Sequence, residues 1–140
     1  MSLKVLVVDD EAGYCALIRR ILRPYGFKIT TCHESSCAVE RLMNERFDLL
    51  ITDLHMPGMT GYDLTELAGR LTSTPSILVI TAQKALLEEA PKRLRNVQCL
   101  LKPFTLDDFR AKIGVLTGCW PSNHPVETDM LPHQDPDGQD

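Results

Sequence analysis

The chain has 140 residues, of which 44% are hydrophobic and 24% are charged, so it can bury the core of one domain. Its longest apolar runs are too short to cross a bilayer, and its N-terminus lacks the apolar segment of a signal peptide, so we expect no membrane association. Five of the 19 acidic residues lie in residues 118–140, and the first 117 residues carry 15 basic and 14 acidic side chains, a balance that argues against direct nucleic-acid binding.

The first half of the chain predicts strands that alternate with helices. Residues 4–8, KVLVV, contain a continuous apolar run typical of a strand buried on both faces. A segment with apolar side chains at helical spacing follows and stops at Pro24. The expected elements are strands at 4–8, 27–32 and 49–52, the last ending at Asp53, a helix at 11–23, and a helix capped by Ser35 or Ser36.

The second half continues the alternation after a loop at 55–61 that is rich in Pro and Gly. Thr105 and Asp108 have the spacing of a helix N-cap, and we expect Leu106, Phe109, Ile113 and Leu116 to face inward from the helix that follows. The expected elements are helices at about 62–70, at about 84–95 with an interruption near Pro91, and after Thr105, and strands at 76–80, ending at Thr81, and at 98–101.

Five strand–helix units in series predict an α/β fold, with a parallel sheet covered by helices on both faces. Residues 118–140 differ from the rest, because they hold four of the nine prolines and have neither a helical nor a strand period. Such a segment buries too little apolar surface to offset its ordering entropy. We expect residues 1–117 to form the domain and residues 118–140 to be a disordered, acidic, Pro-rich tail or the stub of a linker.

The five cysteines show no spacing that indicates a disulfide framework or a zinc site. Their number is odd, and none of them forms a C-x-x-C pair. The sequence therefore predicts free thiols in a reducing cytoplasm. The cysteines are Cys15, Cys32, Cys37, Cys99 and Cys119.

Polar residues follow four of the five expected strands. In an open parallel sheet, the carboxyl ends of the strands meet at one edge, where chemistry gathers. Taken singly, each of these residues is more typical of a turn, a helix cap or a solvated charge, but together they indicate a site. They are Asp9 and Asp10 after the first strand, Asp53 after the third, Thr81 after the fourth and Lys102 after the fifth.

The chemistry of this group points to phosphoryl transfer. Three crowded carboxylates repel one another unless a cation joins them, and oxygen ligands suit Mg²⁺ or Mn²⁺ better than zinc. A carboxylate beside such a cation can act as a nucleophile and form an aspartyl-phosphate. Thr81 could donate a hydrogen bond to a phosphoryl oxygen, and Lys102 could supply a positive charge.

The polar residues at the strand ends fall within four motifs, which are VVDDE at 7–11, TDLHMPGMTG at 52–61, ITA at 80–82 and LKPF at 101–104. Together these motifs resemble the receiver domain of two-component response regulators over residues 3–117. The resemblance implies a flavodoxin-like, doubly wound sheet of five parallel strands in the order 2-1-3-4-5, with five helices. It also implies that Asp53 is the phosphoacceptor, that Thr81 is the switch hydroxyl and that Lys102 binds the phosphoryl group. The cation would be held by Asp9, Asp10, Asp53 and the backbone carbonyl of His55.

The resemblance implies a phosphoryl donor and a downstream effector as partners. The donor would be a phosphohistidine on a sensor histidine kinase or a phosphotransfer protein, and the effector is unknown. The chain would be a regulator that catalyses only its own phosphorylation and dephosphorylation. Whether it forms a homodimer stays open.

One position departs from the family pattern. Three residues before the lysine, where the family usually has an aromatic side chain, this chain has Cys99. A thiol is too small to signal by the same inward rotation, so the phosphorylation site is better supported than the route of signal propagation. His55 and Gln83 each lie two residues after a site residue, and we expect them to tune the lifetime of the phosphorylated state.

Two other classes of protein are compatible with the sequence. A phosphohydrolase that acts on external substrates would have a D-x-D motif after its first strand, with the nucleophile there. This chain instead has adjacent Asp9 and Asp10 at that place. An interaction domain that keeps the fold without phosphorylation would explain Cys99. The acid cluster argues against that reading, because uncompensated carboxylates are costly to hold together.

Overall fold

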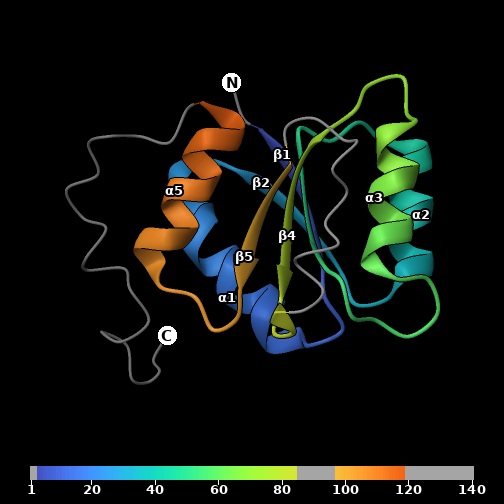
Figure 1. The fold of residues 1–140 in the computed structure, drawn as a ribbon. Helices are drawn as coiled ribbons and strands as arrows, with labels where there is room; N and C mark the ends of the chain where they lie inside the picture. Colours follow the sequence, from blue (N-terminus) through green and yellow to red (C-terminus); the bar gives the residue numbers. More distant parts are fainter. Residues whose placement is uncertain (1–2, 85–96, 119–140) are drawn as a thin grey trace.

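The computed structural model describes residues 3–84 and 97–118, which form a sheet with helices on both faces (Figure 1). All strand pairs are parallel, and the strand order is β2-β1-β3-β4-β5, as the resemblance implied. The strands are β1 (Lys4–Val8), β2 (Lys28–Cys32), β3 (Leu49–Asp53), β4 (Ser76–Thr81) and β5 (Val97–Leu101).

The helices form two layers. α1 and α5 cover one face of the sheet, and α2 and α3 cover the other (Figure 1). In the described segments, none of the helices has the length and hydropathy of a membrane span. The helix expected at 84–95 and the tail expected at 118–140 lie outside the described residues, except for the first residue of each. The helices are α1 (Ala12–Leu22), α2 (Ser35–Asn44), α3 (Gly61–Gly69), α5 (Leu106–Thr117) and a short 3₁₀ helix, η1 (Arg23–Tyr25).

Burial explains why the central strands are continuous apolar runs. β1, β3 and β4 are buried along nearly their whole length, because helices cover both of their faces. β2 and β5 form the two edges of the described sheet and are only partly buried. Successive side chains point to opposite faces, so Leu50 packs under α2 and α3 while Ile51 packs under α1 and α5. This alternation divides the core into two clusters.

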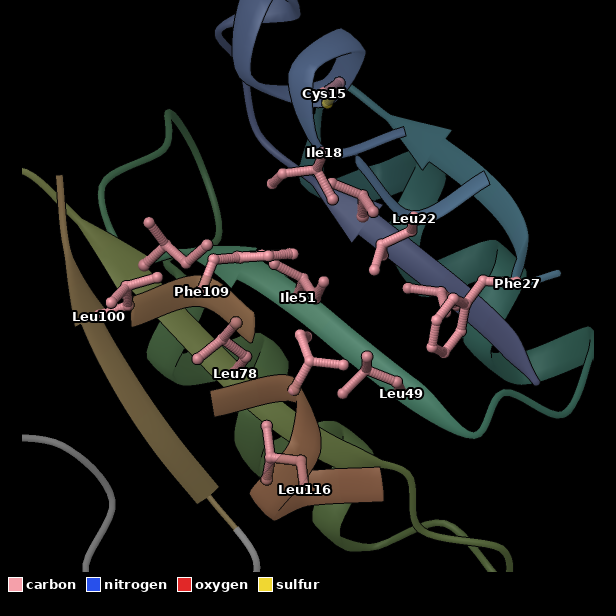
Figure 2. Close-up of a cluster of buried hydrophobic side chains, with 14 residues drawn as sticks. Cys15, Ile18, Leu22, Phe27, Leu49, Ile51, Leu78, Leu100, Phe109 and Leu116 are labelled. Carbon is pink, nitrogen blue, oxygen red and sulfur yellow. The ribbon is translucent and has the colours of Figure 1, made fainter. Parts of the chain in front are cut away.

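The cluster under α1 and α5 is shown in Figure 2. Phe109, Ile113 and Leu116 contribute the buried face of α5, as expected from their helical spacing. Leu49, Ile51 and other strand residues meet them from the sheet. This packing fixes α5, and with it the β5–α5 connection that carries Lys102.

The helix ends differ in part from the prediction. Thr105 caps α5 by accepting a hydrogen bond from the N–H of Asp108, as expected. The expectation that Ser35 or Ser36 caps α2 is wrong, because the helix already includes Ser35, and Glu34 occupies the cap position without a side-chain bond. Pro24 does not end the first helical segment abruptly. It lies in the first turn of η1, where a backbone N–H would have no acceptor within the helix, so proline is tolerated.

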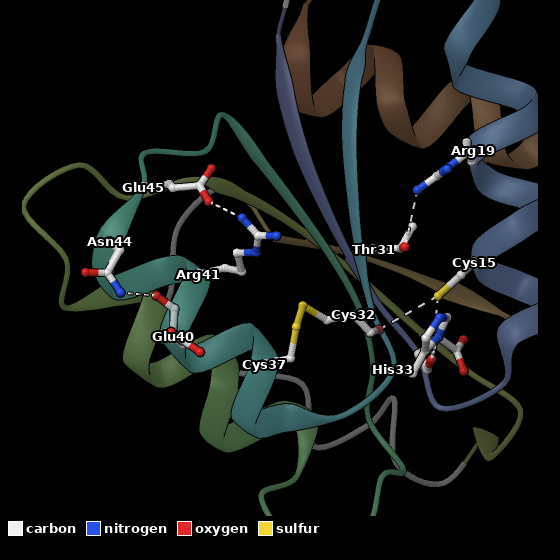
Figure 3. The surroundings of a disulfide bond; sticks show 11 residues. Cys15, Arg19, Thr31, Cys32, His33, Cys37, Glu40, Arg41, Asn44 and Glu45 are labelled. Atoms are coloured by element: carbon white, nitrogen blue, oxygen red, sulfur yellow. Dashed lines mark hydrogen bonds and ion pairs between the residues drawn. A yellow bond between two sulfur atoms is a disulfide. The ribbon is translucent and has the colours of Figure 1, made fainter.

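The expectation of free thiols is wrong for one pair of cysteines. A disulfide joins Cys32, the last residue of β2, to Cys37 in the first turn of α2 (Figure 3). The turn between strand and helix brings the two Cα atoms within 5.8 Å, a separation that a disulfide can bridge. Among the described residues, Cys15 and Cys99 are free thiols, as predicted. Cys119 lies outside these residues.

Candidate functional site

The strand register brings the predicted residues to one edge of the sheet. Asp53 at the end of β3 is aligned with Ile80, and the next residue of β4 is Thr81. Asp9 follows β1 directly, and its N–H donates to the carbonyl of Cys32 at the end of β2. The N–H of Lys102 donates to the carbonyl of Thr81 at 2.8 Å, which extends the ladder between β4 and β5 by one bond.

An acidic cluster occupies this edge. Asp9, Asp10 and Asp53 each offer one carboxylate oxygen, and these oxygens lie within 4.8 Å of one another. Asp9 and Asp53 are only 3% and 6% exposed, whereas Asp10 is open to solvent. Backbone amides orient the two buried carboxylates. The Glu11 N–H donates to Asp9 Oδ1 at 2.9 Å, and the His55 N–H donates to Asp53 Oδ1 at 3.0 Å.

Lys102 is the cation that joins the buried carboxylates. Its Nζ lies 2.8 Å from Asp9 Oδ2 and 3.0 Å from Asp53 Oδ2. A third carboxylate, Glu11 Oε1, also lies at 2.8 Å. The ammonium group stands 4.0 Å from the centre of the Tyr14 ring, a cation–π distance. The lysine is therefore fixed by three anions and one aromatic face.

The charge state of Lys102 follows from two opposing effects. Burial alone would lower its pKa, but the hydrogen bonds to Asp9, Glu11 and Asp53 outweigh burial and raise it. Lys102 therefore stays protonated throughout the physiological pH range. Burial raises the pKa of Asp9, and the hydrogen bond from Lys102 opposes that shift.

The backbone N–H groups of His55 and Gln83 orient two side chains of the site. The His55 amide orients Asp53, and the Gln83 N–H donates to Thr81 Oγ1 at 3.2 Å. The side chains of His55 and Gln83 are both exposed. They can therefore vary without changing the hydrogen bonds that orient Asp53 and Thr81.

Cys99 lies in β5 and packs against the cluster under α2 and α3. It is half-buried and stands three residues before Lys102. The Lys102–Pro103 peptide bond that follows β5 is cis.

Sequence reasoning missed several residues that shape the site. The motif at 7–11 contains Glu11 but gives it no role, and the helical spacing gives none to Tyr14, yet both side chains contact Lys102. Gly61 begins α3 so close to β3 that a Cβ there would overlap the backbone carbonyl of Asp53. A signal for the start of α3 was present, because Thr60 and Asp63 have the spacing of a capping box, and the structure forms one.

The donor set fits a hard divalent cation. All candidate side-chain ligands are carboxylate oxygens, which suit Mg²⁺ and Mn²⁺. Asp10 opens the cluster to solvent on one side, so a cation could keep some of its water ligands, as Mg²⁺ usually does.

A family model described as the response regulator receiver domain matches residues 5–114. The chemotaxis protein CheY of Pseudomonas aeruginosa is 33% identical over 117 residues, which cover 79% of this chain and 93% of that protein. The two-component response regulator ORR21 of Oryza sativa subsp. indica is 32% identical over 114 residues, and the sensor protein EvgS of Escherichia coli is 32% identical over 120. The matches cover 79% and 82% of this chain but only 16% and 10% of those longer relatives.

Solved structures agree with these matches. The response regulator protein TrrA of Thermotoga maritima, solved in complex with Mg²⁺ and BeF, is 25% identical with a TM-score of 0.69, and the match covers 81% of this chain and 98% of that one. The chemotaxis response regulator CheY4 of Vibrio cholerae is 26% identical with a TM-score of 0.70, and the match covers 80% and 99%. The fold of this chain matches the folds of these relatives, and the sequence matches the family model over residues 5–114. The chain belongs to the receiver domain family of two-component response regulators.

Proposed function

We propose that Asp53 accepts a phosphoryl group while Mg²⁺, or Mn²⁺ in its place, is bound by Asp9, Asp10, Asp53 and the backbone carbonyl of His55. The observation that carries this proposal is the position of Lys102, whose ammonium bridges Asp9 and Asp53 at 2.8 and 3.0 Å. A cation at the acidic cluster would offset the negative charge and bind phosphoryl oxygens. The complex of TrrA with Mg²⁺ and BeF supports the choice of cation.

Each group of the chain has a role in this scheme. A carboxylate oxygen of Asp53 attacks phosphorus, the bond between phosphorus and the donor atom breaks, and the donor leaves as the aspartyl-phosphate forms. The His55 amide holds the other oxygen of Asp53 in place. Lys102 stays protonated and moves from carboxylate partners to a phosphoryl oxygen. The Thr81 hydroxyl, buried at the end of β4, donates a hydrogen bond to another phosphoryl oxygen. The protein thus contributes positioning and charge.

The donor in the proposal is a phosphohistidine on a sensor histidine kinase or a phosphotransfer protein. The match to the sensor protein EvgS supports a place in such a relay. Phosphorylation then changes the binding of a downstream effector. A cytoplasmic location fits these partners. The chain acts on its own phosphoryl group and turns over no external substrate.

The test is phosphorylation by a small-molecule donor. With acetyl phosphate and Mg²⁺, intact-mass spectrometry should show the addition of one phosphoryl group, and chelation of the cation should prevent it. Asp53→Ala should abolish the addition. Asp107→Asn is the matched control, because the Asp107 side chain is 93% exposed on α5, and it should be phosphorylated like the wild type.

Two results would contradict the proposal. An unmodified wild-type protein that also fails to bind Mg²⁺ would favour an interaction domain that does not use phosphorylation. Steady turnover of p-nitrophenyl phosphate, lost in Asp53→Ala, would favour a phosphohydrolase.

A further inference from the structure

The Cys32–Cys37 disulfide joins two elements beside the acidic cluster, and the proposed phosphoryl chemistry does not use it. It closes a loop across the turn between β2 and α2 (Figure 3). The two cysteines differ in access. Cys32 is 1% exposed, and Cys37 is partly exposed. A reagent therefore reaches the pair from the Cys37 side.

The disulfide loop is connected to the acidic cluster by direct contacts. The carbonyl of Cys32 accepts the N–H of Asp9 at 3.1 Å. The His33 ring Nδ1 lies 3.4 Å from the carbonyl oxygen of Asp9. The loop also reaches the β3–α3 connection, because a Cβ at Gly58 would stand 3.7 Å from Ser35 Oγ. A change in the turn thus reaches the backbone that carries Asp9.

We propose that Cys32 and Cys37 form a redox-modification site that exchanges with thiols of the glutathione type, and that its state sets the affinity of the acidic cluster for Mg²⁺. In the oxidised state, the disulfide holds the β2–α2 turn and keeps the Cys32 carbonyl against the Asp9 amide. In the dithiol state, that constraint is lost, and the hydrogen bond from the Asp9 amide to the Cys32 carbonyl is weaker. The redox exchange of the two cysteines does not depend on the proposed function, whereas the change in Mg²⁺ affinity rests on it.

Reduction of the disulfide takes two thiol–disulfide exchange steps. A small thiolate attacks Cys37 Sγ, a mixed disulfide forms, and Cys32 leaves as a thiolate that takes up a proton. A second small thiolate attacks the sulfur of the first, which releases Cys37 as a thiolate that is protonated in turn. Two molecules of the monothiol become one disulfide, and two electrons pass to the protein. The reverse reaction, with the small disulfide as oxidant, restores the bond.

The other described cysteines do not compete for this exchange. Cys15 is 2% exposed, and its thiol lies 3.5 Å from the Asp9 carbonyl and 3.9 Å from the Cys32 carbonyl. Cys99 lies on β5, at the opposite edge of the described sheet from β2. Cys99 is therefore a natural internal control for the labelling of the pair.

The first test measures the redox pair in wild-type protein. Residues 29–41 form one tryptic peptide that contains Cys32, Cys37 and no other cysteine. After equilibration in glutathione buffers and trapping with N-ethylmaleimide, this peptide should pass from no label to two labels as the buffer becomes reducing. Cys99 should take one label in every buffer. Two labels on the peptide even in the most oxidising buffer, or glutathione attached to it at equilibrium, would overturn the redox site.

The second test measures the coupling to the acidic cluster. Calorimetric titration with Mg²⁺ should give an affinity roughly fivefold weaker for the reduced than for the oxidised protein, the equivalent of about one hydrogen bond. Cys37→Ser should match the reduced protein under both conditions, and Cys99→Ser should respond as the wild type does. Equal affinities of oxidised and reduced wild type would overturn the coupling.

A third measurement separates this proposal from the proposed function. Hydrogen exchange of the Asp9 amide, whose acceptor is the Cys32 carbonyl, needs no Mg²⁺. Its exchange should be faster in the reduced protein, and equal rates in both states would contradict the structural part of the inference. Failure of Mg²⁺ to bind in either state would refute the proposed function and the regulation of affinity, while labelling and amide exchange would still decide the redox site.

Discussion

Lys102 Nζ lies 3.0 Å from Asp53 Oδ2, although 49 residues separate the two in the sequence. The same ammonium group contacts Asp9 and Glu11. In the proposed function, a phosphoryl oxygen on Asp53 would therefore compete with carboxylates for Lys102. Breaking the ion pairs of the unmodified site would cost free energy, and this cost makes phosphorylation less favourable.

Replacing Lys102 by Met should destabilise the fold and make stability depend on Mg²⁺. The change leaves the buried carboxylates of Asp9 and Asp53 without their cation, at a cost of about 3–5 kcal/mol. In urea denaturation, added Mg²⁺ should restore more stability in the variant than it adds to the wild type. Lys28→Met, an exposed change on the edge strand β2, should alter stability by no more than about 0.5 kcal/mol. A Lys102→Met protein as stable as the wild type without Mg²⁺ would contradict the role of Lys102.

Glu11→Gln should speed phosphorylation by acetyl phosphate. The Glu11 side chain is 61% exposed, so its pair with Lys102 contributes little to stability, but it competes with the phosphoryl group for the ammonium. We expect a rate increase of roughly two- to fivefold, consistent with about 0.5–1 kcal/mol for an exposed pair. The control, Glu40→Gln, changes an exposed side chain on α2. A slower reaction of Glu11→Gln would mean that Glu11 assists the transfer.

Gly61→Ala should destabilise the domain. The added Cβ would overlap the carbonyl oxygen of Asp53 and stand 2.6 Å from Leu54 Cα, and neither backbone atom can move without shifting β3. We expect a loss of about 1–3 kcal/mol in urea denaturation, together with slower phosphorylation because Asp53 moves. Gly13→Ala is the matched control. Gly13 lies in α1 with open space around it, so the change should stabilise the helix or leave it unchanged. Equal effects of the two substitutions would refute the steric argument.

Folding should shift the pH at which Cys99 becomes reactive to a higher value. Burial raises its pKa above the ordinary value of 9.0, and Lys112 partly opposes this shift. Since the fold favours the protonated thiol, Cys99 contributes stability below pH 9.0 that is lost as the pH rises through its folded pKa. The midpoint of iodoacetamide labelling, followed by peptide mass spectrometry, should be higher in the folded protein than in urea. Lys112→Met should raise it further, and an unchanged midpoint on folding would contradict the assigned burial effect.

Changing His55 and Gln83 to Ala should shorten the lifetime of the aspartyl-phosphate. Their backbone amides orient Asp53 and Thr81, and these bonds survive truncation of the exposed side chains. The loss of bulk beside the phosphoryl group admits water, so the half-life measured after removal of the donor should fall. Affinity for Mg²⁺ should stay the same. An unchanged half-life in the double variant would contradict this role.

The fold was predictable because its signals are local or regularly spaced. The central strands are continuous apolar runs, and the buried face of α5 repeats at helical spacing. The strand order came from the family resemblance, since apolar patterns alone do not fix which strands pair. Strand-end positions also predicted that Asp9, Asp53 and Lys102 would meet, because parallel strands end at one edge.

The remaining features depend on tertiary distances. Glu11 and Tyr14 contact Lys102 only because α1 begins beside the β5–α5 connection, and no spacing in the sequence encodes that contact. The disulfide joins residues five apart across a strand–helix turn, a geometry that no common cysteine motif describes. The constraint on Gly61 likewise arises from how closely α3 approaches β3.

The charge around Lys102 also sets an order of events. Four carboxylates and one ammonium group leave this edge of the sheet strongly anionic. A small anionic donor that diffuses toward Asp53 meets electrostatic repulsion until a divalent ion reduces that potential. If Asp53 is phosphorylated as proposed, a divalent cation should therefore bind before the donor, and donors that carry positive charge near their phosphoryl group should react faster than free acyl phosphates.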